Sequence, residues 1–257
     1  MRSLWSSWSR RRKSQANNGM SGLGDSRGRA DTHMAFKIND TLTTDKNSEL
    51  NDGIARALME NIVDVVDLIE RALWELADFT AQRFDLPEQV VVNWLSRLTF
   101  QPGYSVGSPG AAYYADSKLV YVNFAELLTS LRREWRNSLA IPDFLHYGGM
   151  ASLLASTLAH ELEHDIQDQL MDEAYAARSL YQNRPQEYAA EMAMTAVLIQ
   201  RGFSDEEILS QYSGDFTPTQ KRSILAQTKQ ILRENDGRLP LMSGSAWKLQ
   251  VTSRRIL

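Results

Sequence analysis

The sequence has 257 residues, of which 43% are hydrophobic and 23% are charged. This balance is typical of a globular protein and excludes a fully disordered chain, a collagen-like fibre and a coiled-coil rod. The absence of cysteine excludes disulfide scaffolds, cysteine-ligated zinc, iron–sulfur clusters and thiol catalysis. No apolar run is long enough to form a membrane span, and the net charge of −4 gives no electrostatic argument for a nucleic-acid partner.

Positive charge is concentrated in the first 33 residues. They carry seven basic and two acidic side chains, a net charge of +5, whereas the other 224 residues carry 21 basic and 30 acidic ones, a net charge of −9. The segment is also rich in Ser, Gly and Asn, so residues 1–48 are predicted to be a disordered basic segment. A basic arm for an anionic surface and a targeting leader are the alternatives. No apolar stretch follows the basic residues 10–13, so no secretory signal is expected and the predicted localisation is cytoplasmic.

The first predicted elements are helices. Apolar residues at helical spacing over residues 51–84 indicate one long amphipathic helix or two joined ones, and a shorter helix is expected over residues 87–98. Residues 101–110 contain two prolines and three glycines and are predicted to form a turn region. Residues 112–123 indicate a β-hairpin, in which Leu119–Asn123 is the clearest strand.

The rest of the chain is predicted to be mostly helical. A helix is expected over residues 125–139, followed by a break at Pro142 and Gly148-Gly149. Helices then continue to about residue 235, with interruptions near residues 183–185, Gly202 and Gly214. Ser204 begins a capping-box sequence, and Thr217-Pro218 opens another helix. The predicted fold class is therefore α+β and predominantly α-helical.

Two of the four histidines fall in His160-Glu161-Leu162-Glu163-His164, which is the H-E-x-x-H pattern. Residues four apart on a helix lie one above the other, so both imidazoles can bind a single metal ion. Glu161 lies a step around the helix, where it can reach a water bound to that metal. The opposite side of the helix is predicted to be an apolar stripe that packs into the core, made of Ala151, Ala155, Leu158, Leu162 and Ile166. The alternative is a solvated helix face that carries two ordinary histidines.

Catalytic zinc takes three protein ligands and leaves a fourth position open for water. Gln167 and Leu170 stand where the metzincin extension of the pattern has Gly and His, which excludes that class. The third ligand is therefore expected to be a carboxylate from a following helix.

A following helix is predicted to begin at residues 183–185, with Asn183 as its N-cap and Pro185 in its first turn. Glu187 and Glu191 lie four residues apart on one face of this helix. Ala190, between them, is small enough to permit close approach to the histidine-bearing helix.

The H-E-x-x-H pattern followed by Glu187-Tyr188-Ala189-Ala190-Glu191 resembles the gluzincin branch of the zinc metallopeptidases. It looks most like the compact zincin-like proteins of phages and mobile elements, which include small repressor-cleaving metalloproteins. The resemblance extends over roughly residues 111–195. It implies that Glu187 binds Zn²⁺ beside His160 and His164 and that Glu191 orients a histidine ring, although the two glutamates can exchange these roles. It also implies a zincin-like core with Leu119–Asn123 as the edge strand above the cleft, where a peptide can add by backbone pairing. A plain hairpin that covers the core is the alternative.

The H-E-x-x-H pattern and the resemblance to gluzincins together predict a zinc-dependent peptidase that acts on a peptide or protein substrate. Zinc lowers the pKa of its bound water, and Glu161 takes the proton as the water attacks a peptide carbonyl. The expected organisation is a helical subdomain over residues 49–100, a zincin-like metallopeptidase domain over residues 101–235 and a tail over residues 236–257. Four residues are candidates for the group that stabilises the oxyanion: Tyr175, Arg178, Tyr181 and Tyr188.

Two other functions remain as alternatives. One is a non-enzymatic regulatory or interaction module with a structural or vestigial zinc site. The other is binding of nucleic acid through the basic segment, and the net charge of −9 on the rest of the chain argues against it. His33 and His146 are interpreted as ordinary histidines without a role in the site.

Overall fold

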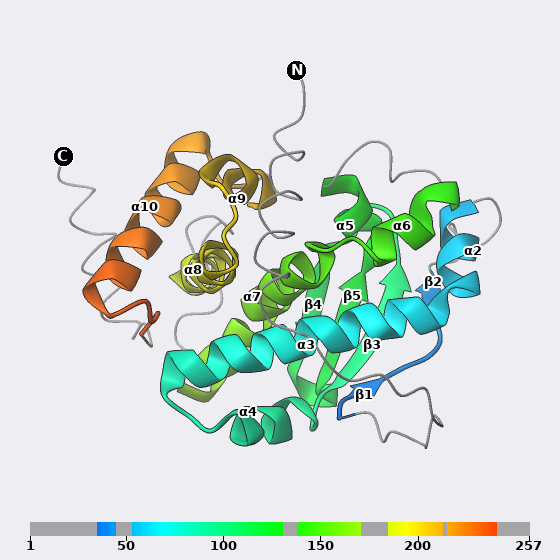
Figure 1. Cartoon of the computed structure of the whole chain (residues 1–257), viewed down its shortest axis with the longest axis horizontal. Helices are drawn as coiled ribbons and strands as arrows, with labels where there is room; N and C mark the ends of the chain where they lie inside the picture. The colour runs from blue at the N-terminus through cyan, green and yellow to red at the C-terminus, as the bar shows by residue number, and fades with distance from the viewer. Residues whose placement is uncertain (1–34, 45–52, 131–137, 171–184, 213–214, 241–257) are drawn as a thin grey trace, which may run out of the picture. The chain divides into compact units, whose positions relative to one another are not determined.

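The computed structural model describes residues 35–44, 53–130, 138–170, 185–212 and 215–240 (Figure 1). Most of the predicted disordered segment and of the predicted tail lies outside these ranges. Two short strands, β1 (Lys37–Ile38) and β2 (Thr43–Thr44), fall within the segment that we expected to be disordered. Ile38 is buried, so regular structure begins earlier than predicted.

The first helical region consists of two joined helices, α2 (Gly53–Glu60) and α3 (Ile62–Phe84). Along α3, buried apolar residues recur every three or four positions, as the sequence pattern predicts. The helix ends at Asp85, whose φ of 53° is left-handed and whose N–H donates to the carbonyl of Ala81. The short helix α4 (Glu88–Leu95) then begins directly after Pro87.

A small mixed sheet follows, with strand order β1-β3-β5-β4 and with β2 also paired to β3. Its longer strands are β3 (Thr99–Tyr104), β4 (Ala111–Tyr114) and β5 (Leu119–Asn123). The strands β1, β2 and β5 run parallel to β3, whereas β4 runs antiparallel to β5. The predicted hairpin is confirmed, and the short 3₁₀ segment η1 (Ala115–Ser117) makes its turn.

Strand β3 corrects the prediction that residues 101–110 form a turn region. Pro102 and Gly103 lie inside the strand, where Phe100 and Tyr104 are buried. Glycine at position 103 accommodates the ring of Tyr121 on the neighbouring strand, because a Cβ there would lie 2.1 Å from that ring and would force it to move. The local Pro and Gly signals were therefore misleading, since the glycine makes room for a side chain from another strand.

The same strand corrects the position of the sheet edge. Leu119–Asn123, predicted to be the edge strand, is an internal strand because β3 pairs with it on one side and β4 on the other. The edge strand is β4. The resemblance to zincins implied the edge position, and the local sequence does not predict that β3 pairs with this strand.

Helices make up most of the remaining chain. They are α5 (Phe124–Ser130), the 3₁₀ segment η3 (Ser138–Ala140), α6 (Ile141–Leu145), α7 (Met150–Leu170), α8 (Pro185–Gln200), α9 (Asp205–Gln211) and α10 (Pro218–Glu234). The helix expected over residues 125–139 is described only as far as Ser130, and Pro142 lies in the first turn of α6 instead of breaking the chain. The predicted capping box at Ser204 and the helix start at Thr217 are both confirmed.

Helix α7 packs against α3, α8 and strand β4 (Figure 1). Its predicted apolar stripe is largely buried, with Ala155 and Leu158 fully covered and Leu162 2% exposed.

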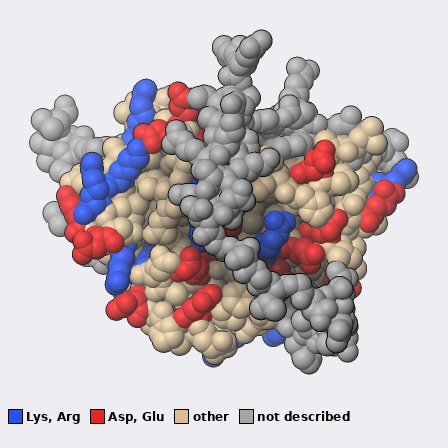
Figure 2. Space-filling model, viewed as in Figure 1, with Lys and Arg blue, Asp and Glu red and all other residues tan. Residues whose placement is uncertain are grey.

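The fold is α+β and predominantly helical, as predicted. No helix in the described part of the chain has the length and apolarity that crossing a bilayer needs. On the face in Figure 2, acidic and basic side chains of the described residues are interspersed.

Candidate metal centre

Two adjacent helices bring His160, His164 and Glu187 together. The histidines lie one turn apart on α7, and Glu187 lies in the first turn of α8. Glu187 Oε2 is 3.5 Å from Nε2 of His160 and 3.5 Å from Nε2 of His164. One potential ligand atom from each residue lies within 4.8 Å of the other two. This convergence is the geometry that a single bound cation needs.

The donor set fits zinc. Two imidazole nitrogens and one carboxylate oxygen are ligands that Zn²⁺ takes in catalytic sites, and three protein ligands leave a fourth position for water or substrate. The side chains of His160 and Glu187 are 11% and 9% exposed, whereas that of His164 is 25% exposed. The group is therefore shielded on one side and reachable from the other.

The electrostatics of the group favour a positive charge. Burial lowers the pKa of His160, but a hydrogen bond to Glu187 and the charges of Glu191 and Glu161 outweigh this effect and raise it to about 9. Carboxylates therefore dominate the surroundings of His160 even though the site is largely covered. Such surroundings suit a cation.

Glu161 lies beside the three potential ligands and is not one of them. Its Oε2 accepts a hydrogen bond from the backbone N–H of Tyr113 on β4, at 3.1 Å. Burial raises the pKa of Glu161, against the opposing effect of the two neighbouring histidines. The carboxylate is thus fixed by the sheet and is a stronger base than an exposed glutamate.

Glu191, the alternative ligand, lies one turn further along α8. It is 2% exposed and lines the same cavity as Glu187, but it does not belong to the group whose ligand atoms converge. Ala189 and Ala190, which separate the two glutamates, are both buried, and α8 packs closely against α7. This agrees with the expectation that small residues let the two helices approach each other.

The group opens into a cavity of about 720 Å³ between β4, α7 and α8. The backbone of residues 107–110 forms part of its wall. Five carboxylates line it, and no Lys or Arg does so among the residues that the structure describes. The five are Glu126, Glu161, Glu187, Glu191 and Asp215. The cavity is therefore large enough for several residues of an extended peptide and is strongly acidic.

Asn123, at the end of β5, holds this wall in place and was not anticipated. Its fully buried amide donates to the carbonyls of Ser105, Ser108 and Pro109 at 2.8–3.0 Å and accepts from the N–H of Ser105 and of Ala125. One side chain thus fixes the loop between β3 and β4. A single Asn at a strand end carries no local signal for such a role.

Glu163, inside the H-E-x-x-H pattern, faces away from the cavity. It is buried and forms a two-pronged ion pair with Arg83 on α3, whose Nε also donates to the carbonyl of Leu239 at 2.8 Å. The pair joins α7, α3 and the segment after α10. Because its two residues are 80 positions apart, the sequence pattern did not indicate it.

The other predicted candidates have different positions. Tyr188 does not line the cavity; its hydroxyl accepts a hydrogen bond from Gln220, and its ring packs edge-on against Phe216. His146 lies 3.6 Å from Asp64, away from the site. Tyr175, Arg178, Tyr181 and His33 lie outside the described residues.

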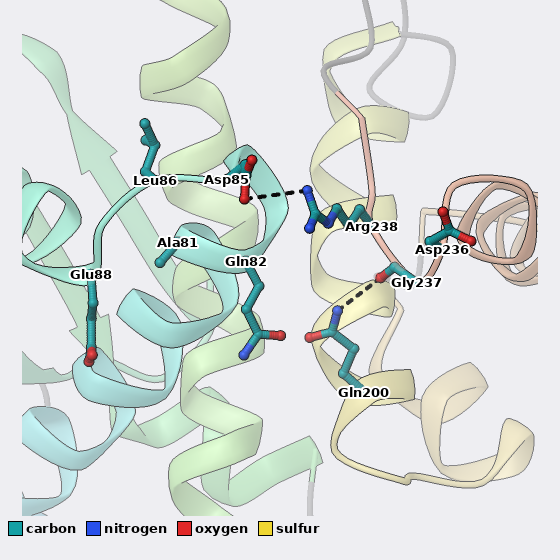
Figure 3. A pocket seen from close by; sticks show the side chains of 9 residues that line it. All are labelled: Ala81, Gln82, Asp85, Leu86, Glu88, Gln200, Asp236, Gly237 and Arg238. Carbon is teal, nitrogen blue, oxygen red and sulfur yellow. Dashed lines mark hydrogen bonds and ion pairs between the residues drawn. The ribbon is translucent and has the colours of Figure 1, made fainter.

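A second hollow, of about 400 Å³, lies between the end of α3, the end of α8 and the segment after α10 (Figure 3). Contacts across it join these elements. Arg238 lies 3.6 Å from Asp85, and the amide of Gln200 donates to the carbonyl of Gly237. No group of converging histidine and carboxylate ligands occurs among the described residues that line it. We interpret this hollow as part of the junction between helices.

Comparison with known proteins returns no match. No family model matches the sequence, and neither the curated proteins nor the solved structures contain a chain that is significantly similar. The function of this chain is therefore inferred from the geometry and chemistry of the residues in the cavity.

Proposed function

We propose that the chain is a zinc-dependent peptidase of the zincin type, in which His160, His164 and Glu187 bind the metal and Glu161 is the general base. The observation that carries this proposal is the convergence of two H-E-x-x-H histidines and a carboxylate from the next helix in one cavity, with Glu161 beside them. An accidental H-E-x-x-H string would have no reason to meet a buried third ligand.

Zinc, when bound, supplies a Lewis acid that activates water and polarises a substrate carbonyl. Glu161 takes the proton of the attacking water and delivers it to the amine that leaves as the peptide bond breaks. Because Tyr113 occupies Oε2, the proton passes through Oε1, which accepts no hydrogen bond from any residue in the described ranges. The raised pKa of Glu161 favours the first half of this transfer, since its carboxylate accepts a proton more readily than that of an exposed glutamate.

The edge strand β4 favours a peptide as the substrate, because a peptide can pair with the backbone of an open strand edge. Asn123 N–H donates to the carbonyl of Gly110, so Gly110 directs its backbone groups toward β5. Backbone groups alternate along a strand, and those of Ala111 and Tyr113 are therefore directed away from β5. Both residues line the cavity. The N–H of Tyr113 already donates to Glu161. We therefore expect an extended peptide to pair with the backbone groups of Ala111 and with the carbonyl of Tyr113, which brings a scissile bond beside Glu161.

Two substitutions test the proposal. Glu161→Gln is expected to retain one zinc per chain and to lose hydrolysis of unstructured protein and peptide substrates, because the amide cannot take a proton. His164→Ala is expected to lose both zinc and hydrolysis. Metal analysis after mild purification and a fluorogenic peptide assay measure the two properties.

His146→Ala is the matched control, since this histidine lies outside the site and its removal should change neither property. Full hydrolysis by Glu161→Gln would contradict the proposed base. Stoichiometric zinc in a wild-type chain that hydrolyses no peptide would favour the non-enzymatic alternative.

A further inference from the structure

Tyr113 on β4 contacts α7 at two points, one helical turn apart. Its backbone N–H donates to Glu161, and its phenolic hydroxyl donates to Oδ1 of Asp165. Glu161 and Asp165 are four residues apart, so they lie one above the other on the same face of α7. One residue thus holds the edge strand against the helix through both its backbone and its side chain.

Lys118, which leads from the hairpin turn into β5, completes the contact with Asp165. Its Nζ lies 2.9 Å from the phenolic oxygen of Tyr113 and 3.3 Å from Oδ1 of Asp165. Asp165 is 2% exposed, whereas the side chain of Lys118 is 53% exposed. A buried carboxylate needs hydrogen bonds and a compensating charge, and Tyr113 and Lys118 supply them from the hairpin. The hairpin is therefore attached to α7 at a fixed register.

We propose that Tyr113 is the positioning residue for Glu161 and that Asp165 and Lys118 hold Tyr113 in place. The backbone N–H of Tyr113 fixes Oε2 of Glu161, which sets the plane of the carboxylate and the direction of Oε1. A shift of the strand would release this hydrogen bond and let the carboxylate rotate. The effect on catalysis rests on the proposed peptidase function, whereas the protection of the Tyr113 backbone N–H does not.

Steady-state kinetics of the full chain loaded with zinc test the catalytic part. Tyr113→Phe removes only the hydroxyl, and we expect kcat to fall about three- to tenfold, as for one lost hydrogen bond, with KM and zinc content unchanged. Asp165→Asn keeps an acceptor for the phenol and should retain more activity than Asp165→Ala. Tyr114→Phe is the matched control: Tyr114 is the adjacent tyrosine, is 52% exposed and should tolerate the change with unaltered kcat.

Amide hydrogen exchange provides a readout that does not depend on activity. In zinc-free and zinc-loaded protein alike, Tyr113→Phe should accelerate exchange of the residue 113 N–H by about tenfold, and Tyr114→Phe should leave it unchanged. Unchanged exchange in Tyr113→Phe overturns the proposal, whatever the activity. If Tyr113→Phe does not fold, the two Asp165 variants provide the test. Equal exchange rates of the Tyr113 N–H in Asp165→Asn and Asp165→Ala would overturn the proposal. If the wild type hydrolyses no peptide, the peptidase function fails and the exchange result alone decides the positioning role.

Discussion

Glu187 and Glu191 lie one turn apart on α8 and occupy the same cavity, but they meet the histidines differently. Glu187 brings one oxygen to 3.5 Å from both Nε2 atoms. Glu191 contributes to the raised pKa of His160 through its charge. We therefore expect Glu187 to bind the metal and Glu191 to act on it indirectly, through the histidine.

Substitution of each glutamate by glutamine separates these roles. Glu191→Gln should weaken zinc binding by about 10- to 100-fold, the usual effect of losing a group that supports a ligand. Glu187→Gln should weaken it more, since a charged ligand is lost. Competition with a zinc chelator measures both affinities. A larger loss in Glu191→Gln than in Glu187→Gln would show that the two roles are exchanged.

The sequence predicts the candidate residues on α7 because their spacing is local. His160, Glu161 and His164 fall within five positions, and one helix determines their relative placement. The choice between Glu187 and Glu191 stayed open because both lie on one face of their helix. That choice depends on where α8 crosses α7, which local spacing does not determine.

At the scale of elements, α7 is held on two opposite sides by charged groups. Asp165 contacts Tyr113 and Lys118 of the β4–β5 hairpin, and Glu163 pairs with Arg83 of α3. Both carboxylates are 2% exposed. Helix α7, which carries the histidines, is thereby fixed relative to the sheet and to α3.

The Arg83–Glu163 pair should therefore be important for stability. Arg83→Met leaves Glu163 buried without its partner and is expected to lower the free energy of unfolding by about 3–5 kcal/mol. Lys229→Met, which breaks the exposed pair with Asp205, should cost only about 0–1 kcal/mol. Urea denaturation of the zinc-free proteins measures the free energy of unfolding of both variants. Equal losses in the two variants would contradict the structural role of the buried pair.

Elements with a periodic apolar pattern were predicted well, and β3 was not. The helices α3 and α7 and the strand β5 follow their patterns closely. In β3, Pro102 and Gly103 interrupt the alternation that marks a strand. The strand forms because Phe100 and Tyr104 are buried and because the ring of Tyr121 lies against Gly103. Those contacts come from the neighbouring strand and from the core, so the local sequence does not contain them.

At the scale of the whole molecule, the cavity is assembled from segments that are distant in the sequence. Residues 107–113, α5, α7, α8 and the region around Asp215 all contribute to its lining. Residues outside 111–195, such as those of the 107–110 loop and Asp215, therefore help to shape it. The position of the cavity follows from the crossing of α7 and α8 beside the edge of the sheet, which the sequence alone did not specify.

Anomalous X-ray diffraction at the zinc absorption edge shows whether His160, His164 and Glu187 bind one zinc ion. Crystals of the Glu161→Gln variant, grown with one equivalent of zinc, are suitable because this variant should keep the metal. We expect a single strong anomalous peak about 2.0–2.2 Å from one nitrogen of each histidine and from an oxygen of Glu187. A peak bound by other residues, or no peak at this site in fully zinc-treated crystals, would show that these three residues are not the zinc ligands.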